Sequence, residues 1–325
     1  MARGRLKITH FKKPILSMGF LFKNNCQGAE MKNPISKRLK EKLINAFKNK
    51  IHLRAKLDIS KLESLGSIDF LNTHINNSLL IYPYVTTNNH KSTTSKRDLI
   101  ETNINKYLNA YEIELSRKNV LYRIAKGDTL VVNKVQEFDH RAQEVCNFFS
   151  GDFNSKTNIN LYYSYKNTTG INVHFDHQDT IVIQTHGNKT WRLFDTAKGK
   201  TSLPAGRSLK PEGTEANNYK EITTQVGDIL YIPKGMWHYA FTTNESSIHL
   251  ALSLSPLKIS ELVIFMLNSK LNELGEKDIY EISKNDLIGA QKLIIESLES
   301  IDITEDDISD IKSEFFPKKI KIALL

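Results

Sequence analysis

The chain has 325 residues, of which 40% are hydrophobic and 25% are charged. These values are typical of a globular protein with one large domain or two ordinary ones. No run approaches the 18 or so apolar residues of a membrane helix, so no membrane span is expected. The only two cysteines, Cys26 and Cys146, lie far apart. This excludes a disulfide framework and favours a reducing compartment such as the cytoplasm.

The net charge of +9 is distributed unevenly along the chain. Residues 1–60 hold 15 Lys and Arg against 3 Asp and Glu, whereas residues 257–325 hold 9 against 14. A basic N-terminal segment is typical of contact with an anionic partner such as RNA, the ribosome or an acidic peptide. A solvated lysine-rich surface is the favoured interpretation, because no aromatic residues interleave regularly with the charges.

The first half of the chain predicts mixed helices and strands. Apolar spacing indicates helices over 36–50, 59–75, 98–117 and 138–149. Short β-prone runs indicate strands over 79–84 and 129–132, and the polar stretch 88–95 indicates a loop.

From residue 158 to 256 the pattern changes to short β-rich runs separated by turn residues. The predicted strands are 160–165, 180–185, 190–194, 229–232, 238–242 and 248–254, with a hairpin turn at Gly187-Asn188. Such spacing is typical of a sandwich or barrel. Helical spacing returns over 259–274 and 286–298. The sequence therefore predicts a mainly β core with flanking helices: α/β elements, a small barrel over about 127–256, and a helical region over 257–325.

His174-Phe175-Asp176 is a candidate metal-binding pair. On a strand, residues i and i+2 point the same way, so both side chains can face one ion. Two imidazoles and one carboxylate on one face of iron(II) leave positions open for cosubstrate and oxygen. The pair alone is weak evidence, since about one HxD or HxE is expected by chance from 10 histidines and 36 acidic residues in 325 positions. His177-Gln178-Asp179 is an overlapping alternative.

A longer motif supplies the third candidate ligand. Gly227, Pro233, Gly235 and His238 have the spacing G(X)5PxG(X)2H, which resembles the second motif of the cupins. A glycine opens a strand, Pro-x-Gly turns the chain, and His238 begins the return strand. In the first cupin motif, a histidine and a glutamate stand where this chain has Asp176 and Thr180. That exchange favours a two-histidine-one-carboxylate site for iron.

Lys189 follows His174 by fifteen residues, in the segment THGNKTWRLF. A dianionic cosubstrate in a partly dry barrel needs a matching cation. Arg192 is the competing candidate. Strand alternation places Lys189 and Trp191 on one face and Arg192 on the other.

Residues 127–256 resemble the Jumonji-C oxygenases, in particular their ribosomal-oxygenase branch. The resembling segments are DTLVVNKV, NLYYSYKNTTGINVHFDHQDTIVIQTHGNKTWRLF and GDILYIPKGMWHYAFTTNESSIHLALSLSP. The resemblance implies a double-stranded β-helix in an oxygenase domain spanning 1–256. It implies iron(II) ligands at His174, Asp176 and His238, and 2-oxoglutarate contacts at Lys189, Asn160, Tyr162 and Thr180.

The resemblance also implies an O2-dependent hydroxylase of a protein or peptide side chain, with the helices after 256 forming a homodimer. An RNA-nucleoside or peptide natural-product hydroxylase, and a metal-binding cupin module without turnover, are the alternatives. The substrate and the hydroxylated atom are not fixed by the sequence.

Overall fold

The computed structural model describes residues 35–198 and 217–258, apart from residues 63, 78, 90–92, 106 and 108, together with residues 260, 261 and 264. The helices predicted over 259–274 and 286–298, and most of the basic N-terminal segment, lie outside these residues. Within them, no helix is long and apolar enough to cross a membrane.

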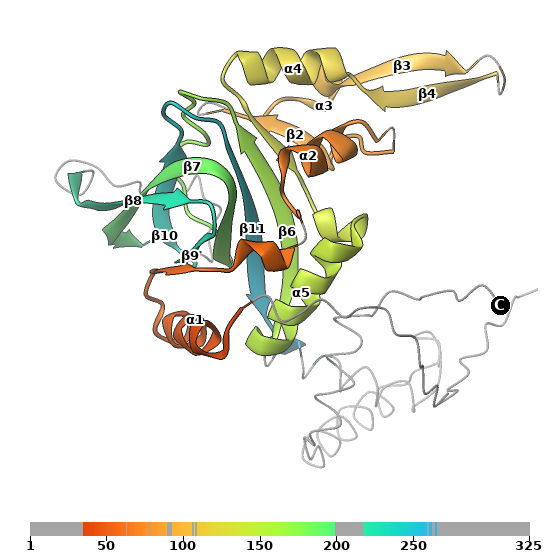
Figure 1. Cartoon of the computed structure of the whole chain (residues 1–325). Helices are drawn as coiled ribbons and strands as arrows, with labels where there is room; N and C mark the ends of the chain where they lie inside the picture. Colours follow the sequence, from red (N-terminus) through yellow and green to blue (C-terminus); the bar gives the residue numbers. More distant parts are fainter. Residues whose placement is uncertain are drawn as a thin grey trace, which may run out of the picture. The chain divides into compact units, whose positions relative to one another are not determined.

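Two facing sheets form the barrel, as Figure 1 shows. The larger sheet has the strand order β1-β9-β7-β11-β6-β5-β2, and all of its neighbouring strands are antiparallel. The smaller sheet consists of β8 and β10 on either side of the second half of β7. The strands are β1 (Leu53–Lys56), β2 (Val85–Asn88), β5 (Thr129–Val132), β6 (Ser155–Ser164), β7 (Asp179–Lys198), β8 (Tyr219–Gln225), β9 (Asp228–Ile232), β10 (Met236–Phe241) and β11 (Ser247–Pro256).

Strand β7 belongs to both sheets and changes the phase of its side chains between them. Ile248 and His249 of β11 pair with His186 and Gln184, so Thr185 is left without a partner in that register. Such a bulge shifts the alternation by one residue. Val182 therefore faces the barrel interior before the bulge, and odd-numbered residues such as Leu193 face it afterwards.

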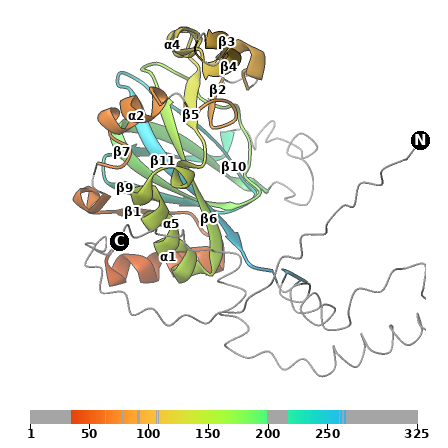
Figure 2. The same ribbon diagram turned by 90° about the vertical axis from the view of Figure 1, so that its right-hand side faces the viewer.

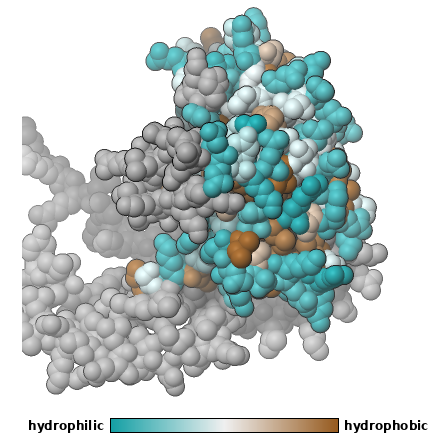
Figure 3. All heavy atoms as spheres, turned by 90° about the vertical axis from the view of Figure 1, so that its left-hand side faces the viewer, coloured by the Kyte–Doolittle hydropathy of each residue, from teal (hydrophilic) through white to brown (hydrophobic). Residues whose placement is uncertain are grey.

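Helices cover the outer face of the larger sheet. The longest are α1 (Lys37–Asn49) and α5 (His140–Phe153), which lie against it in Figure 2. Ser36 caps α1 by accepting a hydrogen bond from the Leu39 N–H, and Asp139 caps α5 by accepting from two backbone N–H groups. The main hydrophobic core joins these helices to the sheet, and a second cluster fills the barrel interior. The face in Figure 3 is largely hydrophilic, with hydrophobic side chains in small groups.

Several predicted elements have the expected place. The helix over 36–50 is α1, the strand over 129–132 is β5, and the helix over 138–149 is α5, which continues through Gly151 to Phe153. The helix expected over 59–75 is divided into a 3-10 turn, η1 (Ile59–Leu62), and α2 (Ile68–Ile75). Residues 79–84 form turns rather than a strand, and β2 begins at Val85.

The helix predicted over 98–117 is wrong. The short helix α3 (Lys96–Leu99) leads into a hairpin of β3 (Ile100–Asn105) and β4 (Ala110–Leu115), and α4 (Arg117–Ala125) follows. In β4 the apolar residues Tyr111, Ile113 and Leu115 recur every second position, and Asn109 adopts a φ of 47° in the turn between the two strands. Alternation and a left-handed asparagine favour a hairpin over a helix.

The predicted hairpin turn at Gly187-Asn188 is also wrong, because β7 continues through it. Gly187 has a φ of +59°, and a Cβ there would lie 1.9 Å from the Ser246 carbonyl oxygen. Glycine is therefore required for a bend within a strand rather than for a turn between two strands.

Candidate metal and cosubstrate site

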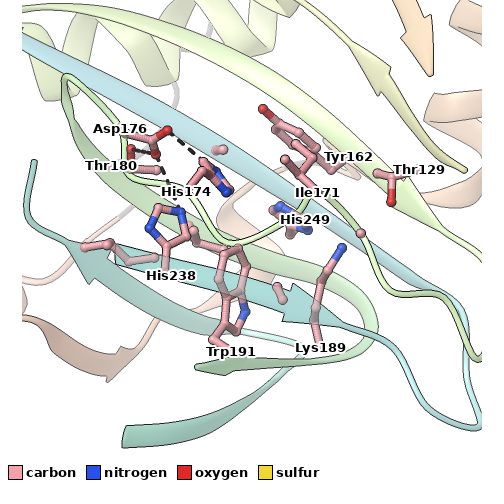
Figure 4. A pocket seen from close by; sticks show the side chains of 15 residues that line it. Thr129, Tyr162, Ile171, His174, Asp176, Thr180, Lys189, Trp191, His238 and His249 are labelled. Carbon is pink, nitrogen blue, oxygen red and sulfur yellow. Dashed lines mark hydrogen bonds and ion pairs between the residues drawn. The ribbon is translucent and has the colours of Figure 1, made fainter. Parts of the chain in front are cut away.

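His174, Asp176 and His238 converge at one end of the barrel interior (Figure 4). One potential ligand atom from each lies within 4.8 Å of the others, and no other cluster of this kind occurs among the described residues. Backbone pairing creates the convergence. The His174 N–H donates to the His238 carbonyl at 3.0 Å, and the His238 N–H donates to the His174 carbonyl at 2.7 Å. An isolated β-bridge thus holds the loop before β7 against β10.

Both imidazoles are oriented by their own backbone surroundings. Nδ1 of His174 lies 2.7 Å from the Asn172 carbonyl oxygen, and Nδ1 of His238 lies 2.9 Å from the Met236 carbonyl oxygen. A carbonyl only accepts, so each Nδ1 carries the proton and each Nε2 presents its lone pair. This is the usual arrangement of metal-binding histidines.

Asp176 completes the set from between the two rings. One carboxylate oxygen lies 3.8 Å from Nε2 of His174, and the other lies 3.8 Å from Nε2 of His238. Thr180 Oγ1 donates a hydrogen bond to this carboxylate at 3.0 Å, and the Gly235 N–H donates to the Asp176 backbone carbonyl at 2.9 Å. The Pro-x-Gly turn therefore holds the aspartate segment.

The electrostatics favour metal binding over protonation. Burial, and secondarily the neighbouring His174, lowers the pKa of His238 to about 4, although Asp176 acts in the opposite direction. His238 is therefore neutral at physiological pH, as a ligand must be. Two neutral imidazoles and one carboxylate on one side of an ion, with the other side open to a cavity, fit iron(II).

The alternative pair His177 and Asp179 is not supported by the structure. The Asp179 carboxylate is fully buried and accepts hydrogen bonds from Lys50 Nζ at 2.8 Å and from Tyr231 Oη at 2.7 Å. The Lys234 N–H donates to it at 3.2 Å. Asp179 thus joins α1, β7 and β9 and is not available as a ligand.

A cavity extends from the three residues into the barrel, and Lys189 lies on its wall. It has about 70 Å³ of open volume, which is room for several water molecules. Lys189 is 3% exposed, and its Nζ donates to Ser164 Oγ at 2.7 Å. No carboxylate pairs with Lys189 in the part of the chain that the structure describes. Burial lowers the pKa of Lys189 to about 7.

The surroundings of Lys189 are polar and closely fitted. Ser164 Oγ and Thr129 Oγ1 lie 2.9 Å apart, so two hydroxyls stand beside the amine. A Cβ on Gly170 would lie 3.5 Å from Thr129 Oγ1 and 3.9 Å from Lys189 Nζ. This end of the cavity holds a buried cation with hydroxyl groups and no counter-charge, which suits a carboxylate ligand.

The prediction that Lys189 rather than Arg192 faces the interior is confirmed. Trp191 lines the cavity with Lys189. Arg192 lies on the opposite face of β7, where it pairs with Glu221 at 2.8 Å and stacks over Tyr219 and Tyr239.

The other predicted cosubstrate residues differ in their positions. Tyr162 and Thr180 line the cavity, but Asn160 does not. Asn160 Oδ1 instead accepts the Lys134 N–H at 2.9 Å and faces a neighbouring groove. Sequence reasoning did not find Thr129 and His249 as cavity residues, or Ser164 as the hydrogen-bond partner of Lys189. No spacing rule connects them to the HxD pair, although all three lie on predicted strands or beside their ends.

Comparison with known proteins shows what this chain is similar to. A model of the JmjC domain matches residues 130–262. The bifunctional lysine-specific demethylase and histidyl-hydroxylase NO66 of Drosophila sechellia is 33% identical over 117 residues, which are 35% of this chain and 18% of that protein. NO66 of Dictyostelium discoideum is 28% identical over 120 residues, which are 36% of this chain and 23% of that protein. The chain therefore matches about a fifth of the length of these relatives.

Solved structures agree on the fold. The X-ray structure of Escherichia coli YcfD matches with a TM-score of 0.51 and 15% identity, over 90% of this chain and 76% of that chain. A second structure, described as YcfD, a ribosomal oxygenase, in complex with cobalt and succinic acid, has a TM-score of 0.50 and 14% identity over 90% and 75%. Residues 130–262 are therefore similar to a JmjC domain in sequence, and the chain shares the fold of the YcfD structures.

Proposed function

We propose that the protein is an iron(II)- and 2-oxoglutarate-dependent oxygenase that hydroxylates a side chain of a protein or peptide. One observation supports this most strongly. A two-histidine-one-carboxylate cluster and a buried lysine without a counter-charge line the same cavity. A site that only stores a metal has no use for such a lysine.

Each residue has a distinct role in this proposal. His174, Asp176 and His238 hold the metal on one face. Lys189 binds the far carboxylate of 2-oxoglutarate, and Thr180 orients Asp176 through its hydrogen bond. When bound, iron and 2-oxoglutarate supply the oxidation of a substrate C–H bond by O2, with succinate and CO2 as coproducts. The protein orients the reactants and limits side reactions.

A groove beside the cavity supports a peptide as the substrate. It is lined by four carboxamide residues, one lysine, one serine, one tyrosine and one proline: Pro83, Tyr84, Asn133, Lys134, Asn158, Asn160, Gln178 and Ser253. Carboxamides both donate and accept hydrogen bonds, as peptide groups do. Ser253 pairs in register with Thr180, and Asn160 is two residues from Tyr162, so the groove adjoins the metal end of the cavity. Histidyl hydroxylation, named for NO66, and a ribosomal substrate, suggested by the YcfD description, are the first candidates.

Three further proposals concern the whole chain. The charge of residues 1–60, with 15 basic and 3 acidic residues, supports contact with RNA or the ribosome. The helical spacing after 256 supports a homodimer through that region. The low cysteine content supports a cytoplasmic location.

Succinate formation tests the proposed activity. Purified protein with iron(II), O2 and 2-oxoglutarate should release succinate, and His174→Ala should abolish this. His140→Ala is the matched control, because that histidine has a 63% exposed side chain and does not line the cavity. If wild-type protein gives no metal-dependent succinate even without a substrate, the proposal is wrong and a non-catalytic cupin module is favoured.

Mass spectrometry separates the substrate classes. Ribosomal proteins, synthetic peptides and RNA are incubated with wild type and with His174→Ala. A gain of one oxygen atom on a protein side chain only in the wild-type reaction supports the proposal. A gain on RNA alone would favour the nucleoside hydroxylase instead.

A further inference from the structure

His249 lies on β11 within the wall of the cavity and is 3% exposed. Its ring is parallel to that of Tyr162, with centroids 4.9 Å apart and an interplanar angle of 2°. The Trp191 ring meets it edge-on at 5.3 Å. Two aromatic neighbours therefore hold the imidazole in one plane.

This imidazole lacks the hydrogen bonds that His174, His238 and Lys189 have in the same cavity. Nδ1 of His249 is fully buried and has no partner. No hydrogen bond to either ring nitrogen occurs within the described ranges. By contrast, His174 and His238 each bond a backbone carbonyl, and Lys189 bonds Ser164. An unsatisfied buried polar group destabilises a folded protein, so packing alone does not account for a histidine here.

His249 lies near enough to Lys189 to feel its charge. Burial lowers its pKa well below the ordinary value, and the next contribution comes from the charge of Lys189. The ring is thus neutral and close enough to Lys189 to respond to its charge. A neutral imidazole offers one N–H donor and one acceptor without adding a second cation.

We propose that His249 is a cosubstrate-binding residue that donates an imidazole N–H to the carboxylate of 2-oxoglutarate held by Lys189. This inference rests on the proposed function. The ring is held ready by Tyr162 and Trp191, and its donor is satisfied only when the dicarboxylate is bound. The stability of the empty protein is thereby lowered in favour of binding.

Two substitutions separate this role from a structural one. His249→Leu removes the polar atoms at similar volume, and His249→Gln retains an N–H donor. The thermal midpoint of the ligand-free protein is measured first. His249→Leu should leave it equal to or above that of wild type, because an unsatisfied polar group has been removed from an apolar site.

Affinity for 2-oxoglutarate is then measured by calorimetry on protein loaded with cobalt(II) under anaerobic conditions. His249→Leu should weaken binding on the order of 10- to 100-fold, as expected for loss of a hydrogen bond to a charged group, and His249→Gln should retain most of the affinity. Cobalt affinity should be unchanged in both variants.

Two outcomes overturn the proposal. They are unchanged affinity in His249→Leu, whatever its thermal midpoint, and equal losses of affinity in the leucine and glutamine variants. Failure of the proposed function gives a different result, because wild-type protein would then bind cobalt without binding 2-oxoglutarate at all.

Discussion

At the scale of single residues, the candidate site depends on which partner each polar side chain already has. The imidazoles of His174 and His238 each use Nδ1 on a backbone carbonyl, which leaves Nε2 for a metal. Asp176 has one hydroxyl donor, from Thr180, whereas Asp179 is fully engaged by its neighbours. The hydrogen-bond partners of the two aspartates therefore distinguish the two overlapping HxD pairs, whereas the composition of the sequence could not.

Substituting the two aspartates should give opposite results. Asp176→Asn should weaken cobalt(II) binding with little change in thermal stability. Loss of a residue that only hydrogen-bonds a metal ligand weakens metal binding by roughly 10–100-fold, and loss of the ligand itself should cost more than that. Asp179→Asn should retain cobalt affinity but lower the free energy of unfolding by on the order of 2 kcal/mol, because it disturbs a buried hydrogen-bonded carboxylate. Calorimetry and denaturant titration measure both. The reverse pattern would mean that the ligand register is wrong.

The lowered pKa of Lys189 predicts a pH-dependent affinity. Its pKa is about 7 in the ligand-free protein because of burial, so the ammonium form decreases as pH rises through 7. Binding of a dicarboxylate requires the charged form. Affinity for 2-oxoglutarate should thus fall by about tenfold per pH unit above pH 7. In Lys189→Arg the residual affinity should be flat over this range, because arginine stays charged. A flat wild-type profile between pH 7 and 9 would contradict this prediction.

The Lys189 amine also affects the folding stability of the ligand-free protein. A lysine whose pKa is lower in the folded protein than in the unfolded chain destabilises the fold at low pH. That penalty is lifted as pH rises from about 7 toward the ordinary lysine value of 10.5. Lys189→Met should therefore be more stable than wild type at pH 6, and the difference should shrink at pH 9. Urea unfolding at the two pH values measures it, and a constant difference would argue against the lowered pKa.

Much of this site could be predicted from local spacing. The glycine and proline positions around His238 and the distance from His174 to Lys189 are short-range patterns with a structural reason. The residues around Lys189 have no such short-range pattern. Ser164 is brought to Lys189, and His249 to the cavity, by the pairing of β6, β11 and β7, and such pairings join residues 60 or more positions apart in sequence.

At the scale of elements, β7 is the main departure from prediction. Glycine followed by asparagine between two β-prone runs is a strong hairpin signal. Here the strand continues for 20 residues, and partners on both sides, β11 and then β8 with β10, satisfy its backbone along the way. Those partner strands are distant in sequence. The local preference of Gly187-Asn188 for a turn was therefore outweighed by strand pairing that cannot be read from the neighbouring residues.

The bend in β7 should not tolerate a side chain. Gly187→Ala should lower the free energy of unfolding by on the order of 2–4 kcal/mol, because φ is +59° and the new Cβ would lie 1.9 Å from a backbone oxygen. Gly151→Ala is the matched control. It lies inside α5 with nothing within 4 Å of a Cβ, and should be neutral or stabilising by up to about 1 kcal/mol. Equal effects of the two substitutions in denaturant titrations would refute this account of the bend.

At the scale of the whole barrel, the cavity joins the two sheets. Its metal end is formed by β10 and the loop before β7, and its other end is formed by β5, β6 and the second half of β7. A bound metal and dicarboxylate would contact all of these elements, so ligand binding should oppose global unfolding.

Thermal denaturation checks this coupling. At a 2-oxoglutarate concentration of 100 times the dissociation constant, cobalt-loaded protein should gain about 2.7 kcal/mol. For a domain of this size that corresponds to a rise in Tm of roughly 5–10 °C. Lys189→Met should lose the rise at the same 2-oxoglutarate concentration while retaining any effect of cobalt alone. A rise that persists in Lys189→Met would place the ligand elsewhere.

The unpaired Thr185 in β7 also governs how this barrel could change by insertion or deletion. Side chains alternate along a strand, so deletion of Thr185 would remove the bulge and leave Lys189 facing inward, whereas deletion of Asn188 with the bulge retained would turn Lys189 outward and bring Arg192 inward. A point substitution alters one contact. A one-codon deletion between the bulge and Lys189 would instead exchange the lysine for an arginine as the interior cation, with both codons intact. Distant relatives that lack the bulge should therefore have an even rather than an odd spacing between an interior residue such as Val182 and the basic residue.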